Sequence, residues 1–129
     1  MYSVGEQTAV IAAQIVVSEK TYEIFVTHLG NDGPIVQLDQ VMKLVEGKQN
    51  ILLMGDFNFR PDTDQYRLAS ATLADAWLLR WPQGNPSQEF DPSGRIDYLY
   101  VSPETKVIES QYLAGPQSDH PVFVTDIAP

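Results

Sequence analysis

Hydrophobic and polar positions divide the chain into short runs that are typical of alternating strands and helices. Ala9–Val17 and Thr21–Thr27 are rich in valine and isoleucine and flank a short polar segment, which predicts a β-hairpin. Asn50–Met54 is almost continuously apolar, as expected of a strand that is buried on both faces. Three further strands are predicted nearer the C-terminus: Ile96–Ser102, Lys106–Leu113 and Val122–Ile127.

Two other segments have helical patterns. Apolar residues within Ile35–Val45 recur at spacings of three and four, which makes one apolar helix face. Pro34 suits the first turn of this helix and Gly47 its end. Asp62 and Gln65 have the spacing of a capping box, which predicts the start of a second helix.

The order of these elements predicts the fold class. The segment from Trp81 to Gly94 holds three prolines and two glycines and is expected to be a loop. Strands followed by helix, strand, helix and more strands indicate an α/β (α+β layered) domain, with a mixed sheet that carries helices on one face. The whole chain, residues 1–129, is short enough to be one domain.

Composition narrows the range of functions. With 8 basic and 17 acidic residues the net charge is −9, which argues against tight, sequence-blind binding to a nucleic-acid backbone. A metal-dependent nuclease stays possible, because bound cations offset carboxylates locally. The absence of cysteine excludes disulfides and thiolate catalysis. The longest apolar run, Ala9–Val17, is far shorter than the roughly 20 residues that span a bilayer.

Asp56 and Asn58 are the first candidates for a chemical site, because they follow a buried strand. In an extended segment, side chains two residues apart point to the same side, so a carboxylate and a carboxamide would converge there. Asp56 suits a hard cation or a nucleophilic water, and the Asn58 amide suits a phosphate oxygen. The alternative is a simple Asp–Phe–Asn turn after a strand.

His28 and His120 are the only histidines, and both fall where a predicted strand meets a loop. Either position has a plain structural alternative, which for His120 is a turn into the last strand. Asp97 lies in an otherwise apolar strand, where a carboxylate is costly to bury without a partner. A histidine is the favoured partner, because a carboxylate fixes the tautomer of an imidazole and raises its pKa. Arg95 or a backbone amide is the alternative partner.

Four short motifs occur in one order: Thr27–Leu29, Gly55–Asn58, Arg95–Tyr98 and Ser118–Pro121. With these motifs the chain resembles the endonuclease/exonuclease/phosphatase family, the deoxyribonuclease-I-like metal-dependent phosphoesterases. The resemblance runs from about Val10 to the C-terminus. It implies hydrolysis of a phosphoester by an activated water. The site would stabilise the transition state of this reaction electrostatically.

The resemblance also assigns roles to residues of this chain. It implies that His28 contacts the scissile phosphate and that Asn58 stabilises it. It implies that Asp56 orients the attacking water or binds metal, and that Asp97 supports an active-site histidine. His120 matches the histidine that is expected to be the general base. These five residues are therefore the expected catalytic set.

The metal site implied by the resemblance is Mg²⁺ or Mn²⁺, with Asp119 and Asp56 as ligands. The family's domain is a four-layer α/β sandwich whose first half supplies an early asparagine and a glutamate ligand. Glu6 and Glu19 lie too close to the predicted hairpin to match that glutamate. The chain is therefore expected to be the C-terminal half of such a domain, with an incomplete metal site and no activity in isolation.

Partners are predicted only as classes. The substrate would be a phosphoester in nucleic acid, phospholipid or a small molecule, and the absent half of the domain would be a partner. A sheet face without that half would be apolar, which predicts a homodimer of the isolated chain. Trp77, Trp81 and Tyr66 either line a pocket or, as favoured, pack in the interior. The rival hypothesis is a non-catalytic fragment or assembly module.

Overall fold

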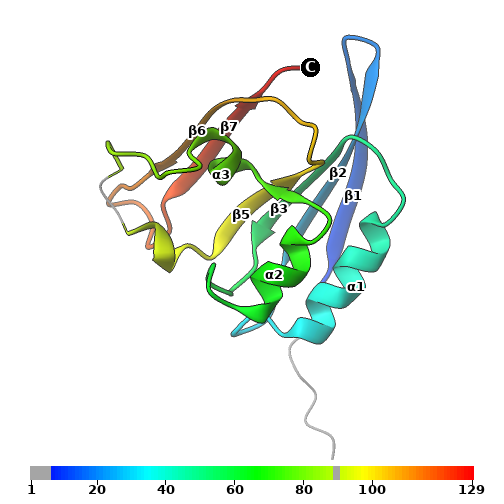
Figure 1. Ribbon diagram of the computed structural model, residues 1–129. Coiled ribbons are helices and arrows are strands. Elements are labelled where there is room, and N and C mark those ends of the chain that lie inside the picture. Colours follow the sequence, from blue (N-terminus) through cyan, green and yellow to red (C-terminus); the bar gives the residue numbers. More distant parts are fainter. Residues whose placement is uncertain (1–6, 89–90) are drawn as a thin grey trace, which may run out of the picture.

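The computed structural model describes residues 7–88 and 91–129. Three α-helices and seven strands follow one another along this part of the chain (Figure 1). In order they are β1 (Val10–Val17), β2 (Lys20–His28), α1 (Ile35–Val45), β3 (Ile51–Asp56), α2 (Asp64–Ser70), β4 (Ala74–Asp75), α3 (Ala76–Arg80), a 3-10 turn (Pro92–Gly94), β5 (Asp97–Val101), β6 (Val107–Leu113) and β7 (Val122–Ile127).

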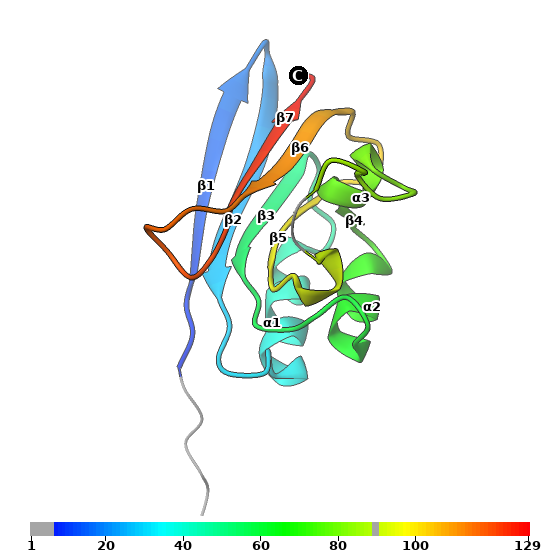
Figure 2. The same cartoon turned by 90° about the vertical axis from the view of Figure 1, so that its left-hand side faces the viewer.

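The strands form two sheets. The larger sheet has the order β1-β2-β3-β5-β4, in which β2 and β3 are parallel and the other neighbours antiparallel. Helices α1 and α2 cover one face of it, and the β6–β7 hairpin lies beside β5 on the other side (Figures 1 and 2). The predicted mixed α/β sheet with helices on one face is confirmed.

The second helix does not begin with the expected capping box. Its N-cap is Thr63, whose Oγ1 accepts the backbone N–H of Tyr66. The side chain of Gln65 instead donates to the carbonyls of Asp32 and Gly33, at 3.2 and 3.1 Å. Gln65 therefore ties α2 to the loop before α1, and the capping-box prediction was wrong because a better cap stands one residue later.

Strand β4 and helix α3 have no counterpart among the predicted elements. Helix α3 has five residues, too few to show a helical period in the sequence. Its start is set by Asp75, whose Oδ1 accepts the backbone N–H of Trp77 at 3.0 Å. Trp77 is 2% exposed and packs against β6 through Tyr112, so tertiary packing stabilises this short helix.

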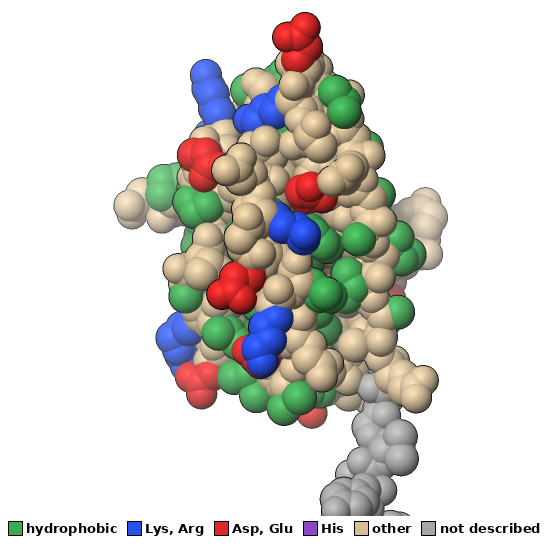
Figure 3. Space-filling view, turned by 90° about the vertical axis from the view of Figure 1, so that its right-hand side faces the viewer, with side chains coloured by type: hydrophobic (Ala, Val, Ile, Leu, Met, Phe, Trp, Pro, Cys, Tyr) green, Lys and Arg blue, Asp and Glu red, His purple; other side chains and the backbone are tan. Residues whose placement is uncertain are grey.

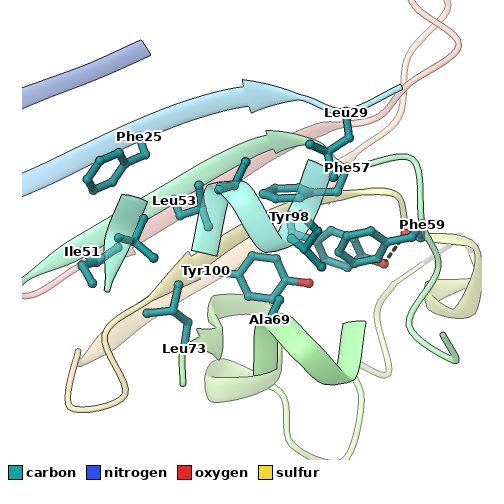
Figure 4. Close-up of a cluster of buried hydrophobic side chains, with 13 residues drawn as sticks. Phe25, Leu29, Ile51, Leu53, Phe57, Phe59, Ala69, Leu73, Tyr98 and Tyr100 are labelled. Atoms are coloured by element: carbon teal, nitrogen blue, oxygen red, sulfur yellow. Dashed lines mark hydrogen bonds between the residues drawn. The ribbon is translucent and has the colours of Figure 1, made fainter. Parts of the chain in front are cut away.

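The hydrophobic core lies between the large sheet and helices α1 and α2 (Figure 4). Phe25 and Leu53 point from β2 and β3 toward the helices, and Tyr100 lies beside Leu53 on β5. Phe57 packs edge-on against Tyr100, with 5.4 Å between ring centroids. Since Phe57 directly follows Asp56, the residue after the strand is fixed by the core.

The opposite face of the sheet carries apolar residues that nothing in the described chain covers. Alternate residues of β1 and β2 are exposed there, among them Ile11 (70%), Ile15 (41%) and Val26 (38%). Figure 3 looks onto the side of the molecule where β1 and α1 lie, and shows hydrophobic side chains in patches among charged ones. Nearer β5, a groove of 520 Å³ separates the β3 and β5 face from β7. Within the described residues, no helix has the length and apolarity that crossing a membrane requires.

A substitution at Gly55 would test how closely β2 and β3 must approach each other. Its φ is +149°, and a Cβ at this position would lie 1.7 Å from the carbonyl oxygen of Thr27 on β2. We expect Gly55→Ala to lower the free energy of unfolding by about 3 kcal/mol or more, because backbone atoms would have to separate. Denaturant unfolding followed by circular dichroism measures this.

The matched control is Gly94→Ala, since no atom lies within 4 Å of a Cβ built there. That variant should unfold within about 1 kcal/mol of the parent chain. Equal unfolding midpoints for the Gly55 and Gly94 variants would show that the close approach of β2 and β3 is not a requirement.

Candidate active site

His28, Asp56 and Asp97 form a row across three neighbouring strands. His28 ends β2 and pairs in register with Asp56, which ends β3. Asp56 pairs in turn with Asp97, which begins the antiparallel strand β5. All three side chains belong to the face of the sheet away from the helices, because Phe25 and Leu53, an odd number of residues earlier, point to the core.

The predicted position of Asp97 needs a small correction. It was expected inside a strand that begins at Ile96. Asp97 is instead the first residue of its strand. Because β5 runs antiparallel to β3, the start of β5 lies at the same sheet edge as the ends of β2 and β3, and the three residues still meet.

Asn58 does not converge with Asp56 in the way an extended segment predicts. The strand ends at Asp56, and Asn58 has a φ of +56°. The Asn58 backbone N–H donates to Asp56 Oδ1 at 2.9 Å, and its side-chain Nδ2 donates to the Leu29 carbonyl at 2.8 Å. The turn alternative is therefore correct for the local geometry. This turn fixes one carboxylate oxygen of Asp56 and connects the loop after β3 to the end of β2.

His120 reaches the row from the loop before β7. Its Nδ1 lies 2.7 Å from Asp97 Oδ2, so the expected hydrogen bond between Asp97 and a histidine is present. The loop is shaped by the His120 backbone N–H, which donates to Ser118 Oγ at 3.0 Å. Arg95, the alternative partner, pairs with Asp75 instead.

The hydrogen bond to Asp97 determines what the other imidazole nitrogen can do. With an ionised Asp97, His120 carries its proton on Nδ1 and leaves Nε2 as a proton acceptor. This Nε2 is 3.8 Å from Asp56 Oδ2, and His28 Nε2 is 3.5 Å from the same oxygen. Both distances are too long for a good hydrogen bond. The oxygen therefore lies near both imidazoles without a good hydrogen bond to either.

Burial and charge shift the pKa values of this pair. The hydrogen bond and the charge of Asp97 raise the pKa of His120 above its usual value of 6.5. Partial burial raises the pKa of the Asp97 carboxyl, against the opposing effect of His120. Protonated His120 therefore stabilises the fold below pH 6.5, and this contribution is lost as the pH rises through the higher pKa of the folded state.

The cluster offers few atoms to a metal ion. One ligand atom each from Asp56, Asp97 and His120 lie within 4.8 Å of one another. However, the Asp97 and His120 atoms are already bonded to each other, which leaves Asp56 Oδ2 as the open oxygen. Mg²⁺ prefers six oxygens in octahedral geometry. The described residues thus fit one side of a metal site and not a whole one. Asp119, the other expected ligand, is exposed and does not belong to this group.

A small pocket of 130 Å³ adjoins the cluster, and Tyr112 of β6 lines it together with Arg95, Asp97, Asp119 and His120. The sequence analysis did not single out Tyr112. It had no signal there beyond an aromatic residue in a predicted strand. Of the other aromatic candidates, Trp77 is buried and Tyr66 donates to Asp75 at 2.7 Å. Both therefore follow the favoured packing interpretation.

The fold and this carboxylate–imidazole cluster define a layered α/β protein with a candidate hydrolytic site at one sheet edge. A sequence model of the endonuclease/exonuclease/phosphatase family matches residues 23–120. The chain therefore belongs to this family. A comparison with curated proteins found no match.

Solved structures have the same fold. An endonuclease/exonuclease/phosphatase from Beutenbergia cavernae is 23% identical with a TM-score of 0.71, covering 94% of this chain and 39% of that one. The human Nocturnin catalytic domain, solved with a bound sulfate anion, is 20% identical with a TM-score of 0.69, covering 97% and 59%. The Neisseria 3′ phosphatase NExo, bound to a product DNA hairpin, is 16% identical with a TM-score of 0.64, covering 98% and 72%. The chain thus spans less than two thirds of the length of these first two relatives.

Replacing Asp97 tests the charge coupling at this site. In Asp97→Asn the pKa of His120 should fall toward 6.5, because the hydrogen-bonded negative charge that raises it is lost. A titration of the imidazole ring protons by NMR measures this directly in the 129-residue chain. Asp126→Asn removes an exposed carboxylate of β7 and should leave the His120 titration in place. An unchanged His120 pKa in Asp97→Asn would mean that the two side chains are not coupled.

Proposed function

We propose that this chain forms part of a metal-dependent phosphoester hydrolase that uses an activated water. The observation that carries the proposal is the Asp97–His120 hydrogen bond, with His120 Nε2 facing Asp56 at 3.8 Å. A carboxylate-oriented imidazole beside an open carboxylate oxygen is an arrangement suited to moving a proton from water. Membership of the endonuclease/exonuclease/phosphatase family supports this chemistry.

In the proposed reaction the water oxygen attacks phosphorus, and the bond from phosphorus to the leaving oxygen breaks. The proton of the attacking water passes to His120 Nε2, while Asp97 holds the Nδ1 proton and stabilises the imidazolium that forms. Asp56 Oδ2 orients the water. The leaving oxygen takes its proton from solvent. These roles follow the positions of Asp56, Asp97 and His120 at one edge of the sheet.

His28 and Asn58 are proposed to contact the phosphate. The His28 side chain is 72% exposed beside Asp56, where it can donate to a phosphate oxygen. The Asn58 side-chain amide donates one of its two hydrogens to the Leu29 carbonyl. We assign its second amide hydrogen to the substrate. Preorganised donors of this kind stabilise the charge that develops in the transition state.

The family is generally dependent on divalent metal, and a bound Mg²⁺ or Mn²⁺ would polarise the phosphate and offset its charge. Asp56 is the residue that would hold it, with Asp119 as a second carboxylate. We propose that residues 1–129 form the C-terminal portion of a complete domain. The remaining metal ligands would then come from outside this chain. The isolated chain is then expected to bind Mg²⁺ weakly and to be inactive.

The substrate is proposed only as a phosphoester, whether in nucleic acid, phospholipid or a small molecule. The experiment is a panel of these three classes, assayed on the full-length protein with Mg²⁺ and with a chelator. His120→Gln should lower turnover by about 10²–10⁴-fold, because the proton acceptor is lost. Asp126→Asn, far from the site on β7, should not.

Three results would contradict the proposal in this panel. One is hydrolysis that survives the chelator, and another is a rate that stays within a few-fold of the parent in His120→Gln. The third is the absence of activity on all three classes. That result would favour the rival hypothesis of an assembly module.

We also propose that the isolated chain self-associates through the apolar sheet face defined by Ile11, Ile15, Val17 and Val26. These four side chains are 38–70% exposed, and contiguous exposed apolar side chains mark interaction surfaces. Ile11→Glu should weaken the association by about tenfold or more, because a charge would be buried in the interface. Analytical ultracentrifugation over a range of concentrations measures this.

The control for the association is Val36→Glu. Val36 is exposed to nearly the same degree as Ile11, 68% against 70%, but it lies on helix α1. It should associate as the parent does. A parent chain that sediments as a monomer at high concentration would refute the dimer, as would equal weakening by both variants.

A further inference from the structure

The backbone around Asp97 is held by donors from two different directions. The carbonyl of Ile96 accepts the backbone N–H of Phe57, the residue after Asp56, at 2.9 Å. The carbonyl of Asp97 itself accepts the hydroxyl of Tyr112, from β6, at 2.6 Å. The peptide groups that carry the Asp97 carboxylate are therefore tied both to the end of β3 and to the second sheet.

Tyr112 is well placed to hold this position. It is 4% exposed, and its ring stacks on Phe123 of β7 with 4.2 Å between centroids and 5° between planes. Its other neighbours include Trp77 of α3, at 6.4 Å between ring centroids. Burial raises the pKa of the Tyr112 hydroxyl. The group therefore stays protonated at neutral pH and remains a donor.

A buried ion pair lies next to the Tyr112 ring. Arg95 and Asp75 are joined at 2.7 Å, with side chains 3% and 2% exposed. The Arg95 guanidinium lies 5.9 Å from the Tyr112 ring centroid and 4.8 Å from that of Trp77. Its Nε donates to the carbonyl of Pro92 at 3.1 Å. A buried pair with further hydrogen bonds resists displacement, because separating it leaves an uncompensated charge.

We propose that Tyr112 is a positioning residue for the Asp97–His120 pair and acts through the main-chain carbonyl of Asp97. Its hydroxyl sets the orientation of the Asp97 peptide group, and this orientation aims the carboxylate at His120 Nδ1. Tyr112 does not contact the reacting atoms. The inference rests on the proposed function for its catalytic meaning, but the hydrogen bond that Tyr112 maintains is measurable without turnover.

The experiment is NMR of the ¹⁵N-labelled chain at a fixed pH. In the parent, the His120 Nδ1 proton should give a low-field, slowly exchanging signal, because it is held by Asp97. In Tyr112→Phe the ring remains and only the hydroxyl is lost. We expect this signal to exchange about tenfold faster or to disappear, the order of effect that one lost hydrogen bond produces.

Tyr100→Phe is the matched control. Tyr100 is a fully buried tyrosine of β5, and within the described chain its hydroxyl has no hydrogen-bond partner. Loss of that hydroxyl should leave the His120 signal as in the parent. The proposal is overturned if Tyr112→Phe retains the parent signal. It is equally overturned if both variants lose the signal to the same extent, since this would indicate general loosening of the core.

A second variant covers the case in which Tyr112→Phe does not fold. Replacement of Tyr112 by 4-aminophenylalanine keeps a donor at the same ring position. Retention of the low-field His120 signal in this variant supports the proposal, and its loss in a folded protein overturns it. Absence of hydrolysis in the substrate panel would count against the proposed function alone, so the two failures are distinguishable.

Discussion

The register of β3 against its two neighbours is the constraint on which the rest of the structure depends. It sets His28, Asp56 and Asp97 opposite one another at one edge of the sheet. A slip of one residue in β3 would turn Asp56 to the helix-covered face and move Leu53 out of the core. Gly55 permits the register, because any side chain there would collide with the backbone of β2. The same pairing buries the core and aligns the site.

The second sheet is attached to the first by side chains and not by a continuous strand ladder. Trp81 Nε1 donates to the carbonyl of Ser110 at 2.8 Å, and Trp77 packs on Tyr112. In the loop of the hairpin, next to Tyr112, His120 is bonded to Asp97. Because these contacts decide where β6 and β7 lie, they also decide whether His120 reaches the carboxylates. Helix α3, the shortest of the three, therefore matters to the site more than its size indicates.

The site and the apolar sheet face lie on the same side of the sheet. Val26 and His28 alternate with the core residues of β2, and Met54 and Asp56 do so on β3. Whatever covers the apolar residues therefore also comes close to Asp56, the open carboxylate oxygen of the cluster. In the proposed function, coverage of the face and completion of the metal site are therefore linked. A net charge of −9 makes an uncompensated carboxylate cluster costly, so a bound cation would lower the repulsion there.

Local sequence determined most elements of this protein, since apolar periods of 2 and 3.6 residues specify which face of a strand or helix is buried. It also pointed to the candidate site residues, because charged groups beside buried strands stand out. Only the tertiary structure decided how they pair. Asp97 forms its hydrogen bond with His120 and not with the nearby Arg95, because Arg95 is paired with Asp75, twenty residues earlier in the chain. The Asn58 side chain donates to the Leu29 carbonyl because the strand ends at Asp56. The Tyr112 hydroxyl reaches the Asp97 carbonyl from a separate sheet. Such pairings depend on contacts between distant segments, which a one-dimensional pattern does not contain.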